Sequence, residues 1–252
     1  MDLDHSVLTV VVLMASGFAG GFVNAVAGGG SLLVFPTLVW VGLDPVTANV
    51  TNAVSLWPGY LSGVAAMKRD LAGTWERVRA WVVLSALAGL AGAMLLLVLP
   101  ATTFERVVPA LVAFASGLLL AQPALRRRSS SSQGTGHPRW LIPALVGAGV
   151  YGGYFGGVVG VLYLAIVSLS GVFAGAAVPA VKNLLQFTVN TVALVVFVAS
   201  GLIVWSAVAL VAPMTLLGGW VGGRTAARLR PDVLRWSVGV FGLVVAVYLL
   251  VR

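Results

Sequence analysis

A run of glycines followed by a hydroxyl residue interrupts the first apolar stretch of the chain, and backbone of this kind can bind a small anion. The run is Gly28-Gly29-Gly30-Ser31 and lies within hydrophobic sequence. A helix that starts after such a break directs free N–H groups and the positive end of its dipole at whatever precedes it. Glycine lets a ligand approach the backbone closely, and the Ser31 hydroxyl can donate as well. The alternative interpretation is close packing of helices through small residues.

A degenerate copy of this motif recurs in the second half of the chain. Glycines at positions 17, 20, 21 and 28 recur at 149, 152, 153 and 160, with a constant offset of 132 residues. An opposing site is therefore expected at Gly156, Gly157 and Gly160, with Tyr163 in the position that corresponds to Ser31. Glycine-broken apolar segments at matching positions of two halves are typical of a transporter's substrate site.

Lys182 is a cation near the start of the apolar segment 178–200. A charge at the centre of a membrane helix costs about 2.5–3.5 kcal/mol, so such a residue normally faces a cavity or a partner. We therefore expect Lys182 to attract an anion, with snorkelling to the interface as the alternative. Gln186 and Asn190 follow at intervals of four and share its helical face. They are expected to line the same path or to hold neighbouring helices together.

Other amide and hydroxyl side chains accompany the glycines. Asn24 precedes the first break by about one helical turn, Thr51 and Asn52 lie early in the third apolar segment, and Asn183 occupies the position equivalent to Thr51. Such groups need partners within a membrane, either the broken backbone or the substrate. The residues predicted to bind substrate are Asn24, Gly28, Gly29, Gly30, Ser31, Thr51, Asn52, Gly156, Gly157, Gly160, Tyr163, Lys182, Asn183, Gln186 and Asn190.

The composition excludes a soluble domain. Hydrophobic residues make up 60% of the 252 residues and charged residues only 9%, whereas a soluble domain carries about 25% charged residues. The net charge of +8 comes from basic residues between apolar segments, where they orient a membrane protein, so no nucleic-acid partner is expected. Cysteine is absent, and His5 and His137 lie outside the apolar segments, so we expect no metal and no other cofactor.

Ten apolar segments, five in each half, predict the fold. They are 6–27, 31–43, 46–67, 75–99 and 103–123, then 140–158, 161–173, 178–200, 204–226 and 233–251. A full crossing needs about 20 residues, and the second segment of each half is too short. The first two segments of each half are therefore predicted to form a broken-helix hairpin, and three transmembrane helices follow it. Irregular backbone at membrane depth must be covered by protein, so the hairpins should be central and face each other.

We expect an all-α integral membrane protein with two inverted repeats. The predicted domains are a first transmembrane repeat at 1–125, a flexible cytoplasmic linker at 126–139, and a second repeat at 140–252. Clusters of basic residues lie at 68–79, within the linker and at 224–235, whereas the loop at 200–205 has no charge. The positive-inside rule places these clusters in the cytoplasm and the uncharged loop outside, so equivalent loops of the two halves lie on opposite sides.

The same charge pattern predicts both termini outside, with Asp2 and Asp4 marking the N-terminus. Arg224 and Arg228 share a helical face beside the predicted cytoplasmic end. Their main predicted role is to set the topology, with recruitment of anions as the second.

Six short motifs in order resemble one known family. They are the glycine run from Gly17 to Gly30, Ala48–Asn52, Gly152–Gly156, Ala180–Asn183, Gly201–Trp205 and Gly218–Gly223. In these residues, over nearly its whole length, the chain resembles the TauE/SafE (TSUP, sulfite exporter) family of membrane anion transporters. The resemblance implies transport of small sulfur-containing or organic anions such as sulfite, thiosulfate and organosulfonates. The second half departs from the Ala-Gly-Gly-Gly pattern, with Val159-Gly160-Val161-Leu162, so the two half-sites are chemically unequal.

A secondary transporter that exports such anions across the cytoplasmic membrane, without catalytic residues, is the leading hypothesis. An anion channel and a structural membrane subunit are the alternatives, and no constellation of histidine, cysteine and carboxylate suggests a membrane enzyme. No carboxylate lies in the middle of a crossing and no P-loop motif is present. The membrane potential, about 2.3 kcal/mol per charge per 100 mV, is therefore the expected driving force. Membrane lipid and the anion are the expected partners, and a homodimer stays open.

Overall fold

Ten helices and no strand make up the described part of this computed structural model, which comprises residues 6–26, 28–129, 138–225 and 231–251. The helices are α1 (Val7–Val26), α2 (Ser31–Trp40), α3 (Pro45–Ala66), α4 (Trp75–Val98), α5 (Ala101–Ser129), α6 (Leu141–Tyr154), α7 (Val159–Ser170), α8 (Ala177–Ser200), α9 (Trp205–Thr225) and α10 (Pro231–Val251). Each corresponds to one predicted apolar segment, so the all-α membrane fold is confirmed.

Helix lengths distinguish two short helices, the second of each predicted hairpin, from the helices that could span a membrane. Helices α2 and α7 have 10 and 12 residues, which is too short for a crossing of about 20. Six of the described helices are long and apolar enough to span a membrane, namely α1, α4, α5, α8, α9 and α10. Helix α3 has 22 residues but carries Asn49, Thr51, Asn52 and Ser55 on buried positions. These polar side chains lower its hydropathy although its length suffices to span.

Local sequence explains where α3 starts. Asp44 accepts a hydrogen bond on Oδ1 from the Thr47 N–H at 3.0 Å, and Pro45 occupies the first helical position. An acidic N-cap followed by proline is a strong start signal because the first N–H groups of a helix lack intrahelical partners. The carboxylate of Asp44 is therefore used in the turn between α2 and α3.

Helix α5 is longer than the apolar segment predicted at 103–123. Helix α5 continues to Ser129 and so passes the predicted end of the first repeat at 125. Residues 130–137 of the predicted flexible linker at 126–139 lie outside the described residues, as do Asp2, Asp4 and Arg228.

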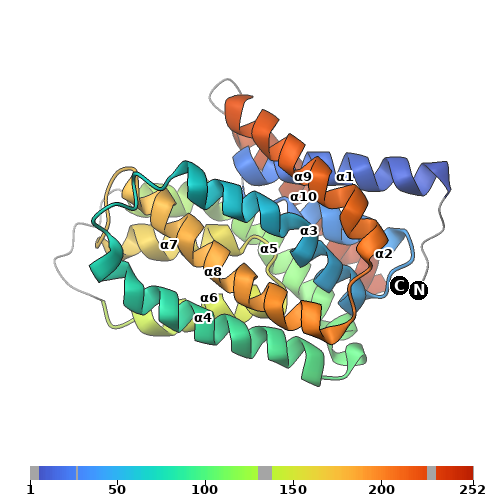
Figure 1. Cartoon of the computed structure of the whole chain (residues 1–252), viewed down its shortest axis with the longest axis horizontal. Coiled ribbons are helices and arrows are strands. Elements are labelled where there is room, and N and C mark those ends of the chain that lie inside the picture. The colour runs from blue at the N-terminus through green and yellow to red at the C-terminus, as the bar shows by residue number, and fades with distance from the viewer. Residues whose placement is uncertain (1–5, 27, 130–137, 226–230, 252) are drawn as a thin grey trace.

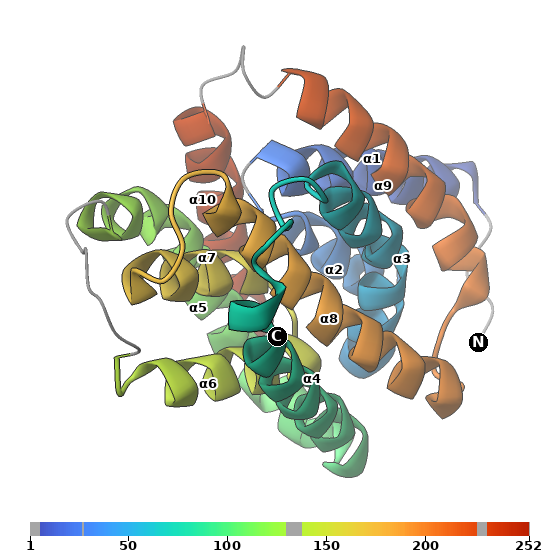
Figure 2. The same ribbon diagram turned by 60° about the vertical axis from the view of Figure 1, so that its left-hand side comes forward.

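The packing of the helices repeats between the two halves. Helix α1 packs along α9, and α6 packs along α4, while α3 packs on α8 and α5 on α10. Replacing each helix by the one five places along the chain reproduces this pattern, including the contacts of α2 with α3 and of α7 with α8. Helices α1 and α9 run side by side in two views, and so do α3 and α8 (Figure 1, Figure 2).

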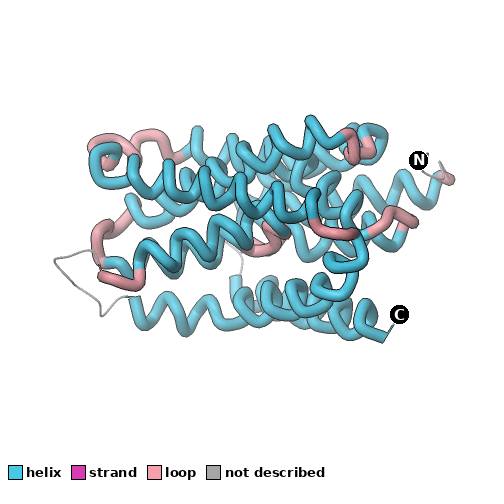
Figure 3. Tube along the Cα trace, turned by 90° about the horizontal axis from the view of Figure 1, so that it is seen from below, coloured by secondary structure: helices cyan, strands magenta, loops and turns pink. Residues whose placement is uncertain are grey.

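The two ends of the helix bundle differ in what they carry. Both termini lie toward one end, and the loops that connect α3 to α4 and α7 to α8 lie at the other (Figure 3). Lys68 and Arg69 belong to the loop after α3. These two basic residues thus lie at the end of the bundle opposite to the termini.

Glycines let the paired helices approach closely. A Cβ on Gly21 would meet the Thr215 carbonyl of α9, and a Cβ on Gly218 would meet the Phe18 carbonyl of α1. In the matching pair, a Cβ on Gly153 of α6 would meet the Gly89 carbonyl of α4. Small residues are what membrane helices use for such contacts. The packing interpretation therefore accounts for glycines at 17–21 and 149–153.

The close approach of Gly153 to the Gly89 carbonyl predicts what a methyl group added at Gly153 would do. Gly153→Ala should lower the free energy of unfolding by about 1–3 kcal/mol because backbone, which cannot move aside, occupies the space. Gly147→Ala is the matched control, because it lies on the same helix and its added methyl group would have no neighbour within 4 Å. It should be neutral or stabilising by up to about 1 kcal/mol. Thermal unfolding in detergent would measure both, and equal midpoints would contradict the packing.

Candidate functional site

A cavity of about 1010 Å³ lies among α1, α3, α8 and α9. It is formed by the C-terminal parts of α1, α3 and α9 and by the N-terminal part of α8. The described residues that line it are Gly21, Asn24, Ala25, Leu56, Gly59, Tyr60, Ser62, Gly63, Ala66, Met67, Pro179, Lys182, Asn183, Gln186, Thr215, Leu216, Leu217, Gly219, Trp220 and Arg224. These helix ends adjoin the basic loop after α3, so the cavity belongs to the predicted cytoplasmic side.

The cavity runs from an exposed rim to a buried floor. Ser62 and Arg224 are exposed at the rim, whereas Leu56 at the floor is 1% exposed and Thr215 is likewise buried. The Thr215 hydroxyl donates to the carbonyls of Ser55 at 3.0 Å and Ala212 at 2.8 Å. Its only proton is thus shared within the wall, and the hydroxyl joins α9 to α3 at the floor.

The cavity wall carries cations and, among its described residues, no carboxylate. Lys182 is half-buried on α8 and has no ion-pair partner among the described residues. Arg224 places its guanidinium carbon 3.7 Å from the centre of the Trp220 ring. A cation–π contact restrains the side chain while leaving the charge available to a ligand. The electrostatics of the wall therefore favour an anion.

Three predicted amides reach the same cavity from two helices. Asn24 comes from α1, and Asn183 and Gln186 come from α8. Asn183 donates from Nδ2 to the Gly63 carbonyl at 3.4 Å and approaches the Met67 sulfur at 3.1 Å. Asn183 therefore also links α8 to the end of α3.

The first break lies behind Asn24 rather than on the cavity surface. Gly28 has a φ of 83°, and its N–H donates to the carbonyls of Val23 and Asn24. A Cβ on Gly30 would lie 2.9 Å from the Asn24 Cβ, and one on Gly29 would lie 2.8 Å from Leu119. Gly28, Gly29, Gly30 and Ser31 do not line the cavity. Gly30 thus leaves room for the Gly20 carbonyl and for the Asn24 side chain beside the break.

The second break is covered in a similar way. Phe155 lies over Gly157, and the Tyr151 hydroxyl donates to the Gly157 carbonyl at 2.6 Å. Gly156 has a φ of 74°, and a Cβ on Gly160 would meet the Gln186 amide oxygen. Gly156, Gly157 and Gly160 are therefore also outside the cavity lining, and Gln186 stands between this break and the cavity as Asn24 does at the first.

The two breaks are close to each other. A Cβ on Gly28 would lie 3.8 Å from Val161 of α7, and the Phe35 and Phe155 rings meet edge to face at 5.5 Å. Val158 has a φ of 59°, which is rare for a β-branched residue and indicates a strained turn. The irregular backbone is thus enclosed by protein on both sides.

Four other predicted site residues are buried away from this cavity. Tyr163 is 0% exposed in the packing of α7. Thr51 accepts the Val204 N–H at 3.2 Å, and Asn190 donates to the Gln186 carbonyl at 2.8 Å. Asn52 is 2% exposed, and its Oδ1 has no hydrogen-bond partner among the described residues. Whether these groups meet a substrate stays a prediction.

Several lining residues escape the sequence prediction. Tyr60, Gly63 and Thr215 carry no pattern that separates them from ordinary helix-packing residues. The spacing of Trp220 and Arg224, four apart, is the signal that indicates their contact, since residues at i and i+4 share a helical face. Only the fold shows that this pair faces the same space as Lys182.

The opposite end of the α3–α8 pair is closed. Asn49 donates from Nδ2 to the Tyr154 carbonyl at 3.0 Å, and Thr51 holds the loop before α9 through Val204. Trp57 donates from Nε1 to the Thr191 hydroxyl at 2.9 Å and packs against Phe187. The cavity is therefore open at one end of the bundle and sealed by these contacts toward the other.

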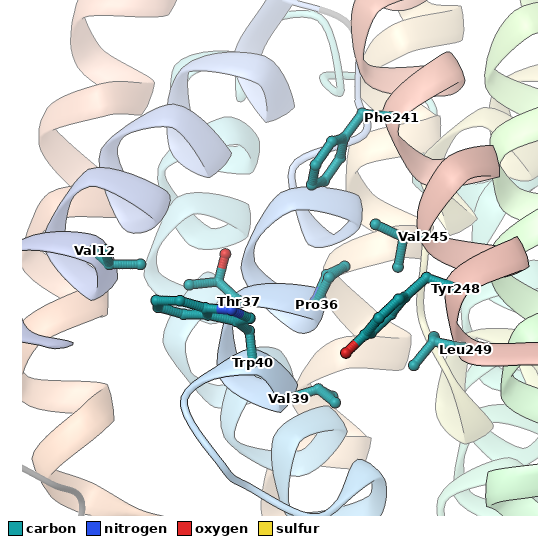
Figure 4. A pocket seen from close by; sticks show the side chains of 9 residues that line it. All are labelled: Val12, Pro36, Thr37, Val39, Trp40, Phe241, Val245, Tyr248 and Leu249. Carbon is teal, nitrogen blue, oxygen red and sulfur yellow. The ribbon is translucent and has the colours of Figure 1, made fainter. Parts of the chain in front are cut away.

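A second pocket of about 340 Å³ lies between α1, α2 and α10 (Figure 4). Its described lining residues carry no charge, and aliphatic and aromatic side chains such as Val12, Phe241 and Leu249 predominate. The Thr37 hydroxyl in it donates to its own helix, at the Leu33 carbonyl, at 2.8 Å. An anion would lose its hydration there without compensation, so the larger cavity is the candidate site.

Six potential spans among the described helices, two short hairpin helices and a cavity between the halves that carries cations and amides form the architecture of a multi-pass membrane transporter. The sequence agrees with this class. The profile of the family described as "Sulfite exporter TauE/SafE" matches residues 13–249, so the chain belongs to this family.

Curated relatives are of the same kind. "Probable membrane transporter protein YfcA" of Escherichia coli (strain K12) is 29% identical over 225 residues, which cover 89% of this chain and 81% of the relative. "Probable membrane transporter protein" of Haemophilus influenzae (strain ATCC 51907 / DSM 11121 / KW20 / Rd) is 25% identical over 226 residues, or 88% of this chain and 87% of the relative. No solved structure matches the chain.

The Trp57–Thr191 hydrogen bond predicts a coupling between α3 and α8. Trp57→Phe and Thr191→Val should each destabilise the protein, and a double-mutant cycle should give a coupling of about 0.5–1.5 kcal/mol. Thr188→Val is the matched control because both threonines bond their own helix, Thr188 at the Leu184 carbonyl and Thr191 at the Phe187 carbonyl. Unfolding midpoints in detergent would measure the cycle. A coupling of Trp57 to Thr188 as large as that to Thr191 would refute it.

Proposed function

We propose that the chain is a secondary transporter that exports small anions, such as sulfite, thiosulfate or organosulfonates, across the cytoplasmic membrane, and that it catalyses no reaction. The observation that carries the proposal is the cavity with Lys182 and Arg224 on its wall and no carboxylate among its described lining residues. An anion that leaves water needs donors and positive charge in return. Lys182, Asn24, Asn183 and Gln186 supply them within one cavity.

A carrier is favoured over a channel by the closed floor. Leu56 is 1% exposed, and bonds from Asn49, Thr51 and Trp57 hold the other end together. A substrate can thus enter from the predicted cytoplasmic side without an open route across. The exchangeable packing of the two halves supports inverted repeats, whose relative rocking would expose the site alternately.

Substitution of Lys182 tests this proposal. The chain has two lysines, Lys182 in the cavity and Lys68 in the exposed loop after α3. Lys182→Met should raise the half-saturating concentration of sulfite for efflux from liposomes roughly tenfold to hundredfold, because a charged hydrogen bond contributes about 1.5–3 kcal/mol. Lys182→Arg should retain most of the affinity since it keeps the charge.

Lys68→Met removes the same charge from the same protein and should leave the half-saturating concentration unchanged. Thiosulfate and sulfoacetate would be measured beside sulfite, so that the preferred anion is identified in one series. Equal effects of the Lys182 and Lys68 substitutions for every transported anion would reject the cavity as the binding site.

A further inference from the structure

Buried polar groups continue along α3 beyond the floor of the cavity. Asn49, Asn52 and Ser55 are 1%, 2% and 0% exposed. Asn49 Oδ1, Asn52 Oδ1 and Ser55 Oγ have no hydrogen-bond partner among the described residues. A buried polar atom without a partner loses its hydration and gains nothing in return. Three such atoms within two turns of one helix call for a physical reason.

Helical spacing places these groups on the line of the cavity wall. Leu56, Gly59 and Gly63 of α3 line the cavity, and Asn52 precedes Leu56 by four residues, which puts it on the same face. Ser55 precedes Gly59 by the same interval, and its carbonyl accepts the Thr215 hydroxyl of the cavity wall. Leu56 therefore separates an open cavity from a polar surface directly beneath it.

We propose that Asn52 and Ser55 line the outer half of the translocation path, with Leu56 as the barrier that closes it in the state seen here. This rests on the proposed transport function and names the next residues that the anion meets. In the state open to the other side, water reaches Asn52 and Ser55 and donates a hydrogen bond to Asn52 Oδ1, while the anion accepts from the donors of the same two side chains. The amide Nδ2 and the hydroxyl then act as donors to the anion.

The two halves differ at this point. The offset of 132 residues pairs Asn52 with Leu184 and Ser55 with Phe187. Apolar residues thus occupy the two equivalent positions of α8. A helix in this place can therefore pack without polar side chains at these positions. The polar side chains of α3 are explained by contact with the substrate, whereas a purely structural role would be fulfilled by a hydrocarbon.

The absence of cysteine from the chain allows a direct test with single introduced thiols. Ser55→Cys, Ser62→Cys and Ser116→Cys change one atom each. Ser62 lines the open cavity, while Ser116 is as buried as Ser55 but bonds the Val112 carbonyl of its own helix α5 at 2.7 Å. Each variant in liposomes is treated with a charged, membrane-impermeant methanethiosulfonate from either face, with sulfite, thiosulfate or sulfoacetate present.

From the outer face, the thiol of Ser55→Cys should react at least about tenfold faster than that of Ser116→Cys, because even a minor outward-open population exposes it. The thiol of Ser62→Cys should react from the inner face. If Ser55→Cys is as unreactive from outside as Ser116→Cys, or reacts only from the inner face, the proposal is wrong. If the thiol of Ser55→Cys reacts from the outer face but none of the three anions is transported, the proposed path is supported and the proposed substrates are rejected.

A second measurement separates a path residue from a structural one. Asn52→Leu copies the residue of the second half and removes a buried atom without a partner, so it should raise the unfolding midpoint by about 2–4 °C. It should also abolish transport of the anion that the unmodified protein carries. Asn49→Leu is the control, since it breaks the bond to the Tyr154 carbonyl and should lower the midpoint. A lower midpoint for Asn52→Leu would overturn the proposal.

Discussion

The constraint on which this structure depends is that broken backbone inside a membrane must be enclosed by protein. Each half interrupts a helix at glycines and restarts it a few residues later, and both interruptions are covered by side chains such as Leu119 at the first and Phe155 at the second. Hydrocarbon cannot satisfy a free N–H or carbonyl. The breaks therefore occupy the interior, whereas the long apolar helices face lipid with large exposed hydrophobic residues.

That enclosure changes the role of the glycines. Gly30 leaves room for Asn24 at the first break, and Gly160 leaves room for Gln186 at the second. Both amides line the cavity and so place polar groups between the breaks and the cavity. The dipoles of α2 and α7 still lie behind them, so the amides sit in a field that favours negative charge. Amide side chains, rather than the free backbone groups of the breaks, thus face the cavity.

The sequence predicts the helices well because hydrophobic periods and lengths are local properties. The ten segments, the two breaks and the cavity positions of Lys182, Asn183 and Gln186 all follow from local spacing and the cost of buried charge. The partnership of α1 with α9 does not, since it joins residues almost two hundred positions apart on glycine contacts such as Gly21 with Thr215. For the same reason Tyr60 and Trp220 could not be assigned to the site, because their side chains acquire a shared space only when four helices meet.

The inequality of the two halves has a kinetic consequence. Lys182 on α8 corresponds by the repeat offset to Val50 on α3, which is buried among hydrophobic residues. In the proposed rocking of the two halves, Val50 would take the place of Lys182 at the opposite end, so the cavity formed there would lack this positive charge. In the proposed transport cycle, the anion would bind more tightly at the predicted cytoplasmic side and dissociate more easily at the opposite side. The apparent affinity for the anion would then differ between the two sides of the membrane. The net direction of flux would still be set by the electrochemical gradient.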